Sequence, residues 1–256
     1  PISESQGVRV PGSDMQRVLL LGGTTEASAL ARTLAKEAID AVFSYAGRTN
    51  APVAQPLPTR IGGFGGAEGF ETFLHNQGIR AVVDATHPYA ARITGRTAKL
   101  CAARGMPYLH VLRHPWAEED GDEWTHVGSI DEAVAAVPPG ACVFLATGRQ
   151  TRVEFDGLEG RRVICRVIDP PREPFPIDGG EYLIGRPSRH AEDEADLLSA
   201  LGVDVVVTKN SGGPGRGKLD AARSLGIAVV MIARPPMPEA ERVATPEEAL
   251  DWIRAL

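Results

Sequence analysis

Short runs of apolar residues recur along the chain, separated by longer stretches in which apolar positions repeat with helical spacing. The runs cover residues 18–21, 81–83, 142–146, 203–207 and 229–232. Runs without polar alternation are typical of strands buried on both faces, as in parallel sheets. Strands that alternate with helices predict the α/β class, in which crossover helices join parallel neighbours.

The chain also shows signs of an internal duplication. Residues 79–115 contain an apolar run, a loop, a helical stretch, a second apolar run and an arginine, and residues 203–236 repeat this order. Each copy is followed by a predicted helix start, at Ser129 and at Thr245, with a hydroxyl at the N-cap and acidic residues in the first turn. We therefore expect two similar halves that end in the same kind of helix.

A turn cluster at residues 138–140 separates the end of a helix from the next apolar run and predicts a domain boundary. Residues 16–138 then form an N-terminal Rossmann-like domain and residues 139–256 a C-terminal one. Each domain has a parallel sheet, and the ligand cleft lies between them. Residues 1–15 are interpreted as a tag remnant or disordered leader before a native start at Met15.

The first predicted strand ends in a turn that suits a phosphate. Open parallel sheets bind ligands beyond the carboxyl ends of their strands. Here residues 22–26 read Gly-Gly-Thr-Thr-Glu, so that glycines admit a ligand close to the backbone and the next helix offers amides and a positive dipole end. The turn lacks the GxGxxG spacing, and tight packing is the competing explanation.

The second predicted strand, residues 41–45, ends in Ala46, Gly47 and Arg48. NAD enzymes carry an acidic residue near this place for the ribose hydroxyls, whereas a guanidinium pairs with a 2′-phosphate. Arg48 therefore favours NADPH over NADH, with a surface arginine as the alternative. Residues 62–66 again place bare backbone at a strand end, either for a ligand or as a flexible turn.

Three further strand ends carry polar side chains. The strand that ends at Asp84 leads into a loop with two hydroxyls and one imidazole, at residues 86, 87 and 89. In the second half, residues 209–213 begin with a lysine, which can reach an anion while backbone amides share its charge. The first strand of that half leads into residues 147–149, which end in an arginine.

Together these motifs resemble the precorrin-6A reductase family in order and spacing. The combination comprises Gly-Gly-Thr-Thr-Glu-Ala at residues 22–27, Asp-Ala-Thr-His-Pro-Tyr at residues 84–89 and Lys-Asn-Ser-Gly-Gly at residues 209–213. The resemblance covers residues 17–256. It implies two Rossmann-like domains around a nicotinamide cofactor, NADPH, and reduction of one double bond of precorrin-6A to give precorrin-6B in cobalamin biosynthesis.

The resemblance also implies roles for individual residues. The residues expected to hold the cofactor are Gly23, Thr24, Thr25, Glu26, Ser44, Gly47, Arg48, Gly62, Gly63, Phe64, Gly65 and Thr86. Those expected to face the macrocycle are Tyr89, Thr147, Gly148, Arg149, Ser211 and Gly212, and the catalytic candidates are Lys209 and His87. One departure concerns residues 186–190, which read Arg-Pro-Ser-Arg-His where relatives usually show Gly-Pro-Phe, so no function is assigned to them.

Composition narrows the partners to a small molecule. A net charge of −6 without a long basic run argues against nucleic acid, and no apolar run is long enough to span a membrane. The three cysteines lie too far apart in sequence for a metal cluster or a disulfide framework. We expect a cytoplasmic enzyme without metal, and a monomer is the working expectation.

Three alternatives remain open at this point. The first is a cobalt-precorrin-6A reductase of the anaerobic branch that uses NADH. The second is a non-catalytic dinucleotide-binding module, because paired Rossmann-like domains also bind nucleotides without turnover. The third is a sugar-nucleotide transferase with a similar cleft, which a glycosyl-transfer assay would reveal.

Overall fold

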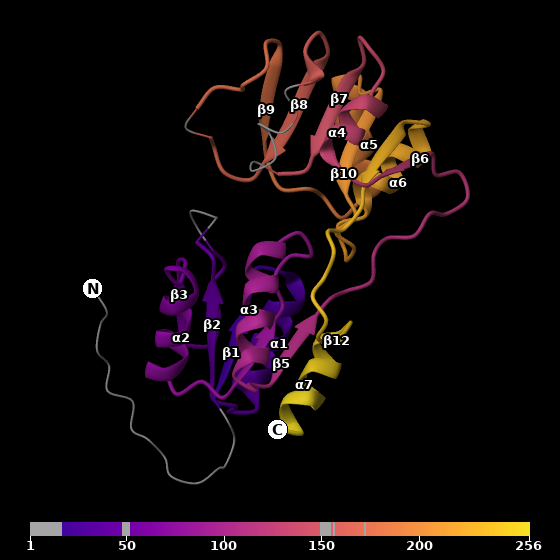
Figure 1. The fold of residues 1–256 in the computed structure, drawn as a ribbon. Coiled ribbons are helices and arrows are strands. Elements are labelled where there is room, and N and C mark those ends of the chain that lie inside the picture. Colours follow the sequence, from indigo (N-terminus) through magenta and orange to yellow (C-terminus); the bar gives the residue numbers. More distant parts are fainter. Residues whose placement is uncertain (1–16, 48–51, 149–154, 156, 172) are drawn as a thin grey trace.

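The computed structural model describes residues 17–256 except residues 48–51, 149–154, 156 and 172. Within these residues, the chain forms two six-stranded sheets in which the paired strands are parallel, and helices cover both faces of each (Figure 1). The predicted α/β class with two tandem Rossmann-like units is confirmed. The leader and Met15 lie outside the described residues.

The first sheet has the strand order β12-β5-β4-β1-β2-β3. Its strands are β1 (Val18–Leu21), β2 (Ala41–Tyr45), β3 (Thr59–Ile61), β4 (Ala81–Asp84), β5 (Tyr108–Val111) and β12 (Glu241–Val243). Helices α1 (Thr25–Lys36) and α7 (Pro246–Arg254) cover one face, and α2 (Gly66–Asn76) and α3 (Ala91–Ala103) cover the other. Val18 and Leu20 pack on the first face and Leu19 and Leu21 on the second, which explains the unbroken apolar run.

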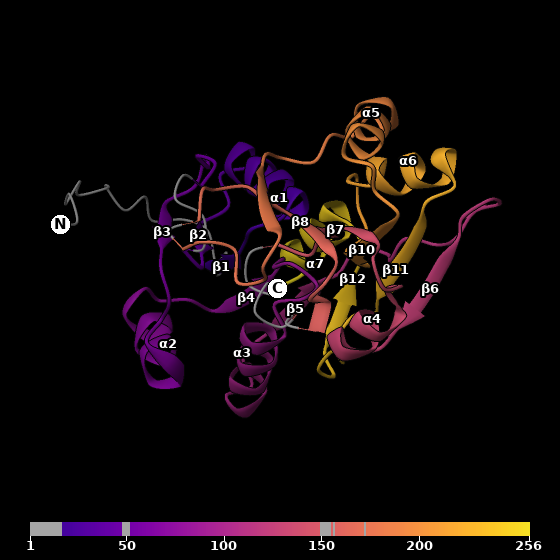
Figure 2. The ribbon, with the colours of Figure 1, turned by 90° about the horizontal axis from the view of Figure 1, so that it is seen from above.

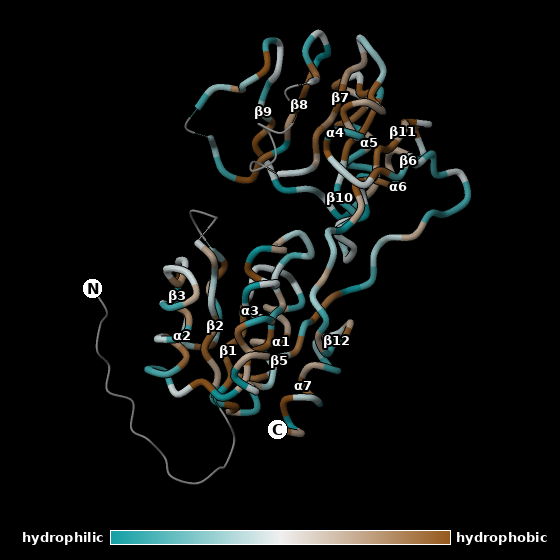
Figure 3. Tube along the Cα trace, in the orientation of Figure 1, coloured by the Kyte–Doolittle hydropathy of each residue, from teal (hydrophilic) through white to brown (hydrophobic). Residues whose placement is uncertain are grey.

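The second sheet has the order β6-β11-β10-β7-β8-β9. Its strands are β6 (Trp124–Val127), β7 (Cys142–Ala146), β8 (Arg162–Val167), β9 (Gly180–Ile184), β10 (Val205–Lys209) and β11 (Ala228–Ile232). Helix α4 (Ile130–Ala136) lies on one side of the strands, and α5 (Ala191–Leu201) and α6 (Gly217–Leu225) lie on the other (Figure 2). Apolar residues concentrate in the strands of both sheets (Figure 3).

Strand β10 begins and ends two residues later than the apolar run predicted. Thr208 and Lys209 belong to it because they pair with Met231 and Ile232 of β11. Lys209 is therefore the last residue of a strand instead of the first residue of a loop, which ties its backbone to the sheet.

The two halves exchange their last strand and helix, so a division at residue 138 does not separate the sheets. Strand β6 pairs with β11 of the second sheet, and β12 pairs with β5 of the first. The chain passes between the sheets through a first linker, residues 112–123, and returns through a second linker, residues 233–240 (Figure 1). The cause is that no helix follows β5 or β11 directly, so each strand lacks the crossover that would return the chain to its own sheet.

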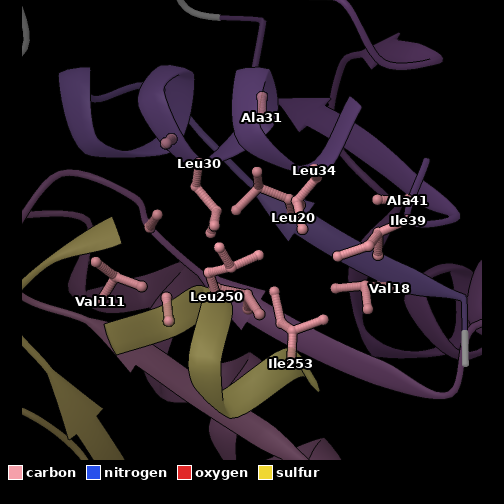
Figure 4. Packing of buried hydrophobic residues seen from close by; sticks show 14 of the residues in the cluster. Val18, Leu20, Leu30, Ala31, Leu34, Ile39, Ala41, Val111, Leu250 and Ile253 are labelled. Carbon is pink, nitrogen blue, oxygen red and sulfur yellow. The ribbon is translucent and has the colours of Figure 1, made fainter. Parts of the chain in front are cut away.

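The exchanged helix α7 completes the core of the first sheet. Leu250 and Ile253 of α7 point towards Val18 and Leu20 of β1 and belong to one buried cluster with α1 (Figure 4). The predicted helix starts are confirmed, since Ser129 accepts a hydrogen bond from the amide of Glu132 and Thr245 forms a capping box with Glu248. Each repeat thus supplies a capped helix to the other repeat's sheet.

Candidate active site

The turn after β1 is shaped by packing as well as by its open backbone. Gly22 is required because a Cβ atom there would lie 2.0 Å from the ring of Phe43, whereas a Cβ at Gly23, whose φ is +132°, would meet nothing within 4 Å. Thr24 is the N-cap of α1: its hydroxyl accepts from the amide of Ala27 at 3.1 Å and donates to the carbonyl of Ala85 at 2.8 Å. Because these bonds occupy the hydroxyl, the backbone amides of the first helical turn are the groups suited to a phosphate.

Glu26 lies in that first turn and forms an ion pair across the site. Its Oε2 atom lies 2.7 Å from Nη1 of Arg113, a residue just after β5, and 3.1 Å from the hydroxyl of Thr25. Burial raises the pKa of Glu26, but its own backbone amide and the Arg113 guanidinium lower it by more, so the pKa lies below its usual value. The carboxylate is therefore charged at neutral pH.

The glycine-rich loop after β3 is held by an arginine that the sequence analysis missed. Arg60 donates to Oγ of buried Ser44 at 3.0 Å and to the carbonyls of Gly62 at 2.8 Å and Gly63 at 2.9 Å. Its guanidinium also lies 3.9 Å from the ring centroid of Phe64. Arg60 lies two residues before Gly62 in sequence, and this position beside the glycines is the signal that could have revealed it.

The loop after β4 rests on a buried carboxylate. Asp84 accepts from the amide of Thr86 at 3.0 Å and from the hydroxyl of Tyr108 at 3.0 Å. The Thr86 hydroxyl lies 3.2 Å from the hydroxyl of Thr94 on α3, and both side chains are buried. In this structure Thr86 supports the loop through these contacts.

His87 and Tyr89 reach towards the second sheet from the same loop. The Tyr89 hydroxyl donates to the carbonyl of Ile232 at the end of β11, and Nζ of Lys209 lies 5.3 Å from the centroid of its ring. Burial raises the pKa of Tyr89 to about 12, so the phenol keeps its proton. Nδ1 of His87 accepts from the amide of Tyr89 at 3.3 Å, which leaves the proton of a neutral ring on Nε2.

The surroundings of His87 hold its ring neutral. Desolvation first, and then the charges of Arg113, Lys209 and Arg234, lower the pKa of His87 to about 4, while Glu26 opposes them. Part of the side chain is exposed, so water screens these charges, and the direction of the shift is what matters for chemistry. At neutral pH the ring is therefore not protonated on both nitrogens and cannot act as an imidazolium acid.

The loop after β10 is anchored to the first linker. The side chain of Asn210 exchanges two hydrogen bonds with the backbone of Trp116, at 2.7 and 3.0 Å, and the indole of Trp116 donates to the carbonyl of Gly213 at 2.8 Å. A Cβ atom at Gly212 would lie 2.0 Å from the carbonyl oxygen of His114, so only glycine fits there. These contacts hold the Lys209–Gly213 segment in place.

The structure brings part of the predicted site together. Glu26, His87, Tyr89, Lys209 and Ser211 meet where the carboxyl ends of the two sheets face each other (Figure 1). Thr147 and Gly148 follow β7, which pairs with β10, whereas the glycine-rich loop lies on the far side of β1 and β2. Arg48 and Arg149 lie outside the described residues. The residues missed are Arg60, Arg113, Trp116, Asn210 and Arg234.

The arrangement of the first sheet fits a dinucleotide. A small pocket at the β1 turn is lined by Thr24, Glu26, Thr86, Pro88, Val111 and Arg113. Two strands away, Cβ atoms at Gly62, Gly63 and Gly65 would meet nothing within 4 Å, so a ligand can approach that backbone closely. Over the described residues, no cluster of three or more His, Cys, Asp or Glu residues could hold a metal ion.

Comparison with known proteins identifies similar chains over nearly the whole length. The family model described as precorrin-6x reductase CbiJ/CobK matches residues 17–254. The precorrin-6A reductase of Rhodobacter capsulatus is 46% identical over 241 residues, which are 93% of this chain and 96% of that protein. The cobalt-precorrin-6A reductase of Priestia megaterium is 30% identical over 91% of this chain and 96% of its own.

A solved structure supports the same likeness. The structure titled CobK precorrin-6A reductase matches with a TM-score of 0.89 and 46% identity, covering 94% of this chain and 97% of that chain. No helix in the described part of this chain has the length and apolar character needed to cross a membrane.

Proposed function

Because the chain belongs to the precorrin-6x reductase family, we propose that it transfers hydride from NADPH to precorrin-6A and yields precorrin-6B in cobalamin biosynthesis. One observation carries the proposal. The turn after β1, residues 22–26, which suits a phosphate, lies close to the Lys209–Gly213 segment at the end of β10 in the other sheet. Glu26 and Ser211, one from each side, both contact Arg113. Cofactor and macrocycle can thus bind to different sheets with their reacting atoms between them.

The relatives favour the metal-free substrate. The relatives named precorrin-6A reductase in R. capsulatus and Sinorhizobium are 46% and 42% identical to this chain, whereas those named cobalt-precorrin-6A reductase in P. megaterium and Synechocystis are 30% and 27% identical. Cobalt-precorrin-6A with NADH as donor is therefore the second candidate.

We assign the cofactor to the first sheet. The Thr25 amide at the start of α1, with Gly23, the N-cap Thr24 and Glu26 beside it, would hold the pyrophosphate. Ser44, Gly47, Arg48 and residues 62–65 would hold the adenosine end, with the Arg48 guanidinium on the 2′-phosphate. Thr86 supports the loop that borders the nicotinamide, which supplies the hydride when it is bound.

The macrocycle would lie against the second sheet. Its carboxylates suit Lys209 and Arg149 as cations, and the backbone of Gly148 and Gly212 with the hydroxyl of Ser211 as hydrogen-bond donors. Tyr89 and Thr147 would border its edge. The local cations make this binding possible although the whole chain carries a net charge of −6.

Positioning accounts for most of the catalysis we propose. Orienting two bound reactants can contribute about 7 to 11 kcal/mol, and Lys209 would stabilise charge that develops on the macrocycle. Since the ring of His87 is neutral at pH 7, it cannot act as an imidazolium acid. The proton that completes the reduction would come from water, with the Nε2–H group of His87 orienting it.

The test is a fluorescence titration of the protein with NADPH and with NADH, repeated with Arg48→Ala. A preference for NADPH that is lost in the variant supports the assignment of the 2′-phosphate, and turnover of precorrin-6A then tests the reaction. Arg104→Ala is the control, because Arg104 pairs with Glu71 on the surface at 2.9 Å. Binding of neither cofactor would overturn the proposal, equal binding would favour the cobalt-containing substrate, and binding without turnover would favour a non-catalytic module.

A further inference from the structure

Two arginines occupy equivalent places in the two repeats and converge on one loop. Arg113 follows β5 at the start of the first linker, and Arg234 follows β11 at the start of the second. Both donate to the carbonyl oxygen of Ser211, Arg113 through Nε at 2.7 Å and Arg234 through Nη2 at 3.1 Å. The residues at which the chain leaves each sheet therefore hold the lysine-bearing loop.

Arg234 acts as the fixed partner of this pair. Its Nε donates to the carbonyl of Asn210 at 2.8 Å, and its Nη1 donates to the carbonyl of Arg113 at 2.8 Å. All three of its contacts are therefore backbone oxygens on the Lys209–Gly213 segment or the first linker. Arg234 joins these two pieces of backbone to each other.

Arg113 differs because it also contacts the other side of the site. Its Nη1 forms the ion pair with Glu26, while its side chain lies so close to Gly213 that a Cβ there would be 2.9 Å from Cδ. The side chains of Arg113 and Glu26 are only 15% and 16% exposed, so water screens the pair weakly. One guanidinium thus links the first turn of α1 to the loop that carries Lys209.

The negative charge of Glu26 makes its ion pair with Arg113 important for binding of the proposed cofactor. A carboxylate in the first turn of α1 lies where the proposed cofactor would place its pyrophosphate, and two anions at a helix start repel each other. Arg113 lies against Glu26 and compensates its charge. A lysine could supply the charge, but its single ammonium group lacks the fork with which Arg113 contacts Glu26 and Ser211 at once.

We propose that Arg113 is a positioning residue with two separable roles, which rest on the proposed function. Its charge neutralises Glu26, so that a dinucleotide can bind at α1, and its Nε–H bond to Ser211 fixes the distance between the cofactor and the Lys209 loop. The first role governs cofactor affinity. The second governs the rate of hydride transfer once both ligands are bound.

The experiment measures the NADPH dissociation constant and the single-turnover rate of hydride transfer for four variants of the full chain. We expect Arg113→Ala to weaken NADPH binding about tenfold or more and to slow transfer about a hundredfold, the scale of a misplacement of about 1 Å. Arg113→Lys should recover NADPH affinity to within about threefold of the wild type yet remain at least about tenfold slow. Glu26→Gln combined with Arg113→Ala should bind NADPH more tightly than Arg113→Ala alone, and Arg104→Lys serves as the control.

Amide hydrogen exchange of residues 209–213 without ligand provides a second measurement that does not depend on activity. Faster exchange in Arg113→Lys supports the bond to Ser211, and unchanged exchange with a wild-type transfer rate overturns that role. If the Glu26→Gln substitution does not restore affinity, the charge role is wrong. The wild type tests the proposed function separately. If the wild type does not bind NADPH, that function is contradicted, whatever the rates of amide exchange in the variants.

Discussion

His87 shows how the setting of one residue decides its chemistry. An imidazole in a loop at a strand end reads from the sequence as an acid that can hold a proton near neutral pH. In the structure, desolvation lowers the pKa of His87, and the positive charges of Arg113, Lys209 and Arg234, which come from both repeats, lower it further, to about 4. These cations come from residues far apart in sequence, so the sequence predicted the residue but not its protonation state.

The first prediction concerns this pKa. In NMR titration, the His87 ring should titrate well below 6.5, towards about 4, because desolvation and neighbouring positive charge disfavour the imidazolium form. Arg113→Ala should raise the pKa, since it removes one of these charges. The folded pKa lies below the unfolded one, so the neutral ring favours folding above pH 6.5, and this contribution is lost as pH falls towards 4. His87→Gln identifies the resonance, and titration at or above 6.5 would contradict our assignment.

Hydrogen bonding explains which other residues could be predicted. Thr24 and Thr86 were identified correctly as residues of the strand-end loops, but their hydroxyls contact Ala85 and Thr94 within the fold. Arg60 lies two residues before Gly62, and Arg113 recurs as Arg234 in the repeat. Both were missed because their partners become neighbours only when the strands pair. Local motifs thus predict where a site lies, while its cations depend on tertiary contacts.

At the scale of elements, one buried ion pair joins β8 to α5. Arg166 of β8 contacts both carboxylate oxygens of Glu194 at 2.8 and 2.9 Å, and Glu194 also accepts from the amide of Ser188 at 2.8 Å. Glu192, Asp193 and Glu194 lie in the first turn of α5, where negative charge complements the helix dipole. Glu194 has the further task of holding the 186–190 segment, which the sequence left unassigned.

The second prediction tests this pair by comparing a single substitution with a replacement of both partners. Glu194→Gln should lower the free energy of unfolding by about 3 to 5 kcal/mol, because it leaves a buried guanidinium unpaired. It also removes the carboxylate that offsets desolvation of nearby Lys218, whose pKa burial lowers to about 8. Replacing both partners, as Arg166→Met with Glu194→Leu, should cost less than the single change. Urea unfolding measures each variant.

The control for this comparison is the exposed pair of Arg162 with Glu181, at 2.9 Å on neighbouring strands β8 and β9. Glu181→Gln should change stability only slightly, because water screens an exposed pair. A Glu194→Gln variant as stable as Glu181→Gln would show that the buried pair does not anchor α5.

At the scale of the whole molecule, the exchange of strands could not be read from the sequence. Helix caps predicted α4 and α7, and the repeat predicted that these helices are alike, but no predicted apolar run covers β6 or β12. These features do not reveal which sheet each helix joins, since β6 and β12 carry no mark of their partner. The clue lay directly after β5 and β11, where the sequence contains linkers instead of crossover helices.

The third prediction rests on this exchange and concerns Leu250, which is 8% exposed in the core between α7 and β1 (Figure 4). Leu250→Ala should cost about 2 to 5 kcal/mol, the usual range for a truncated core leucine. Although the change lies six residues from the C-terminus, amide exchange should accelerate first in β1 and β4 and much less in β7 and β10. Leu225→Ala, at a position 40% exposed at the end of α6, is the control and should leave both sheets protected. Faster exchange confined to β7 and β10 would mean that α7 stabilises the sheet nearest in sequence, contrary to the exchanged fold.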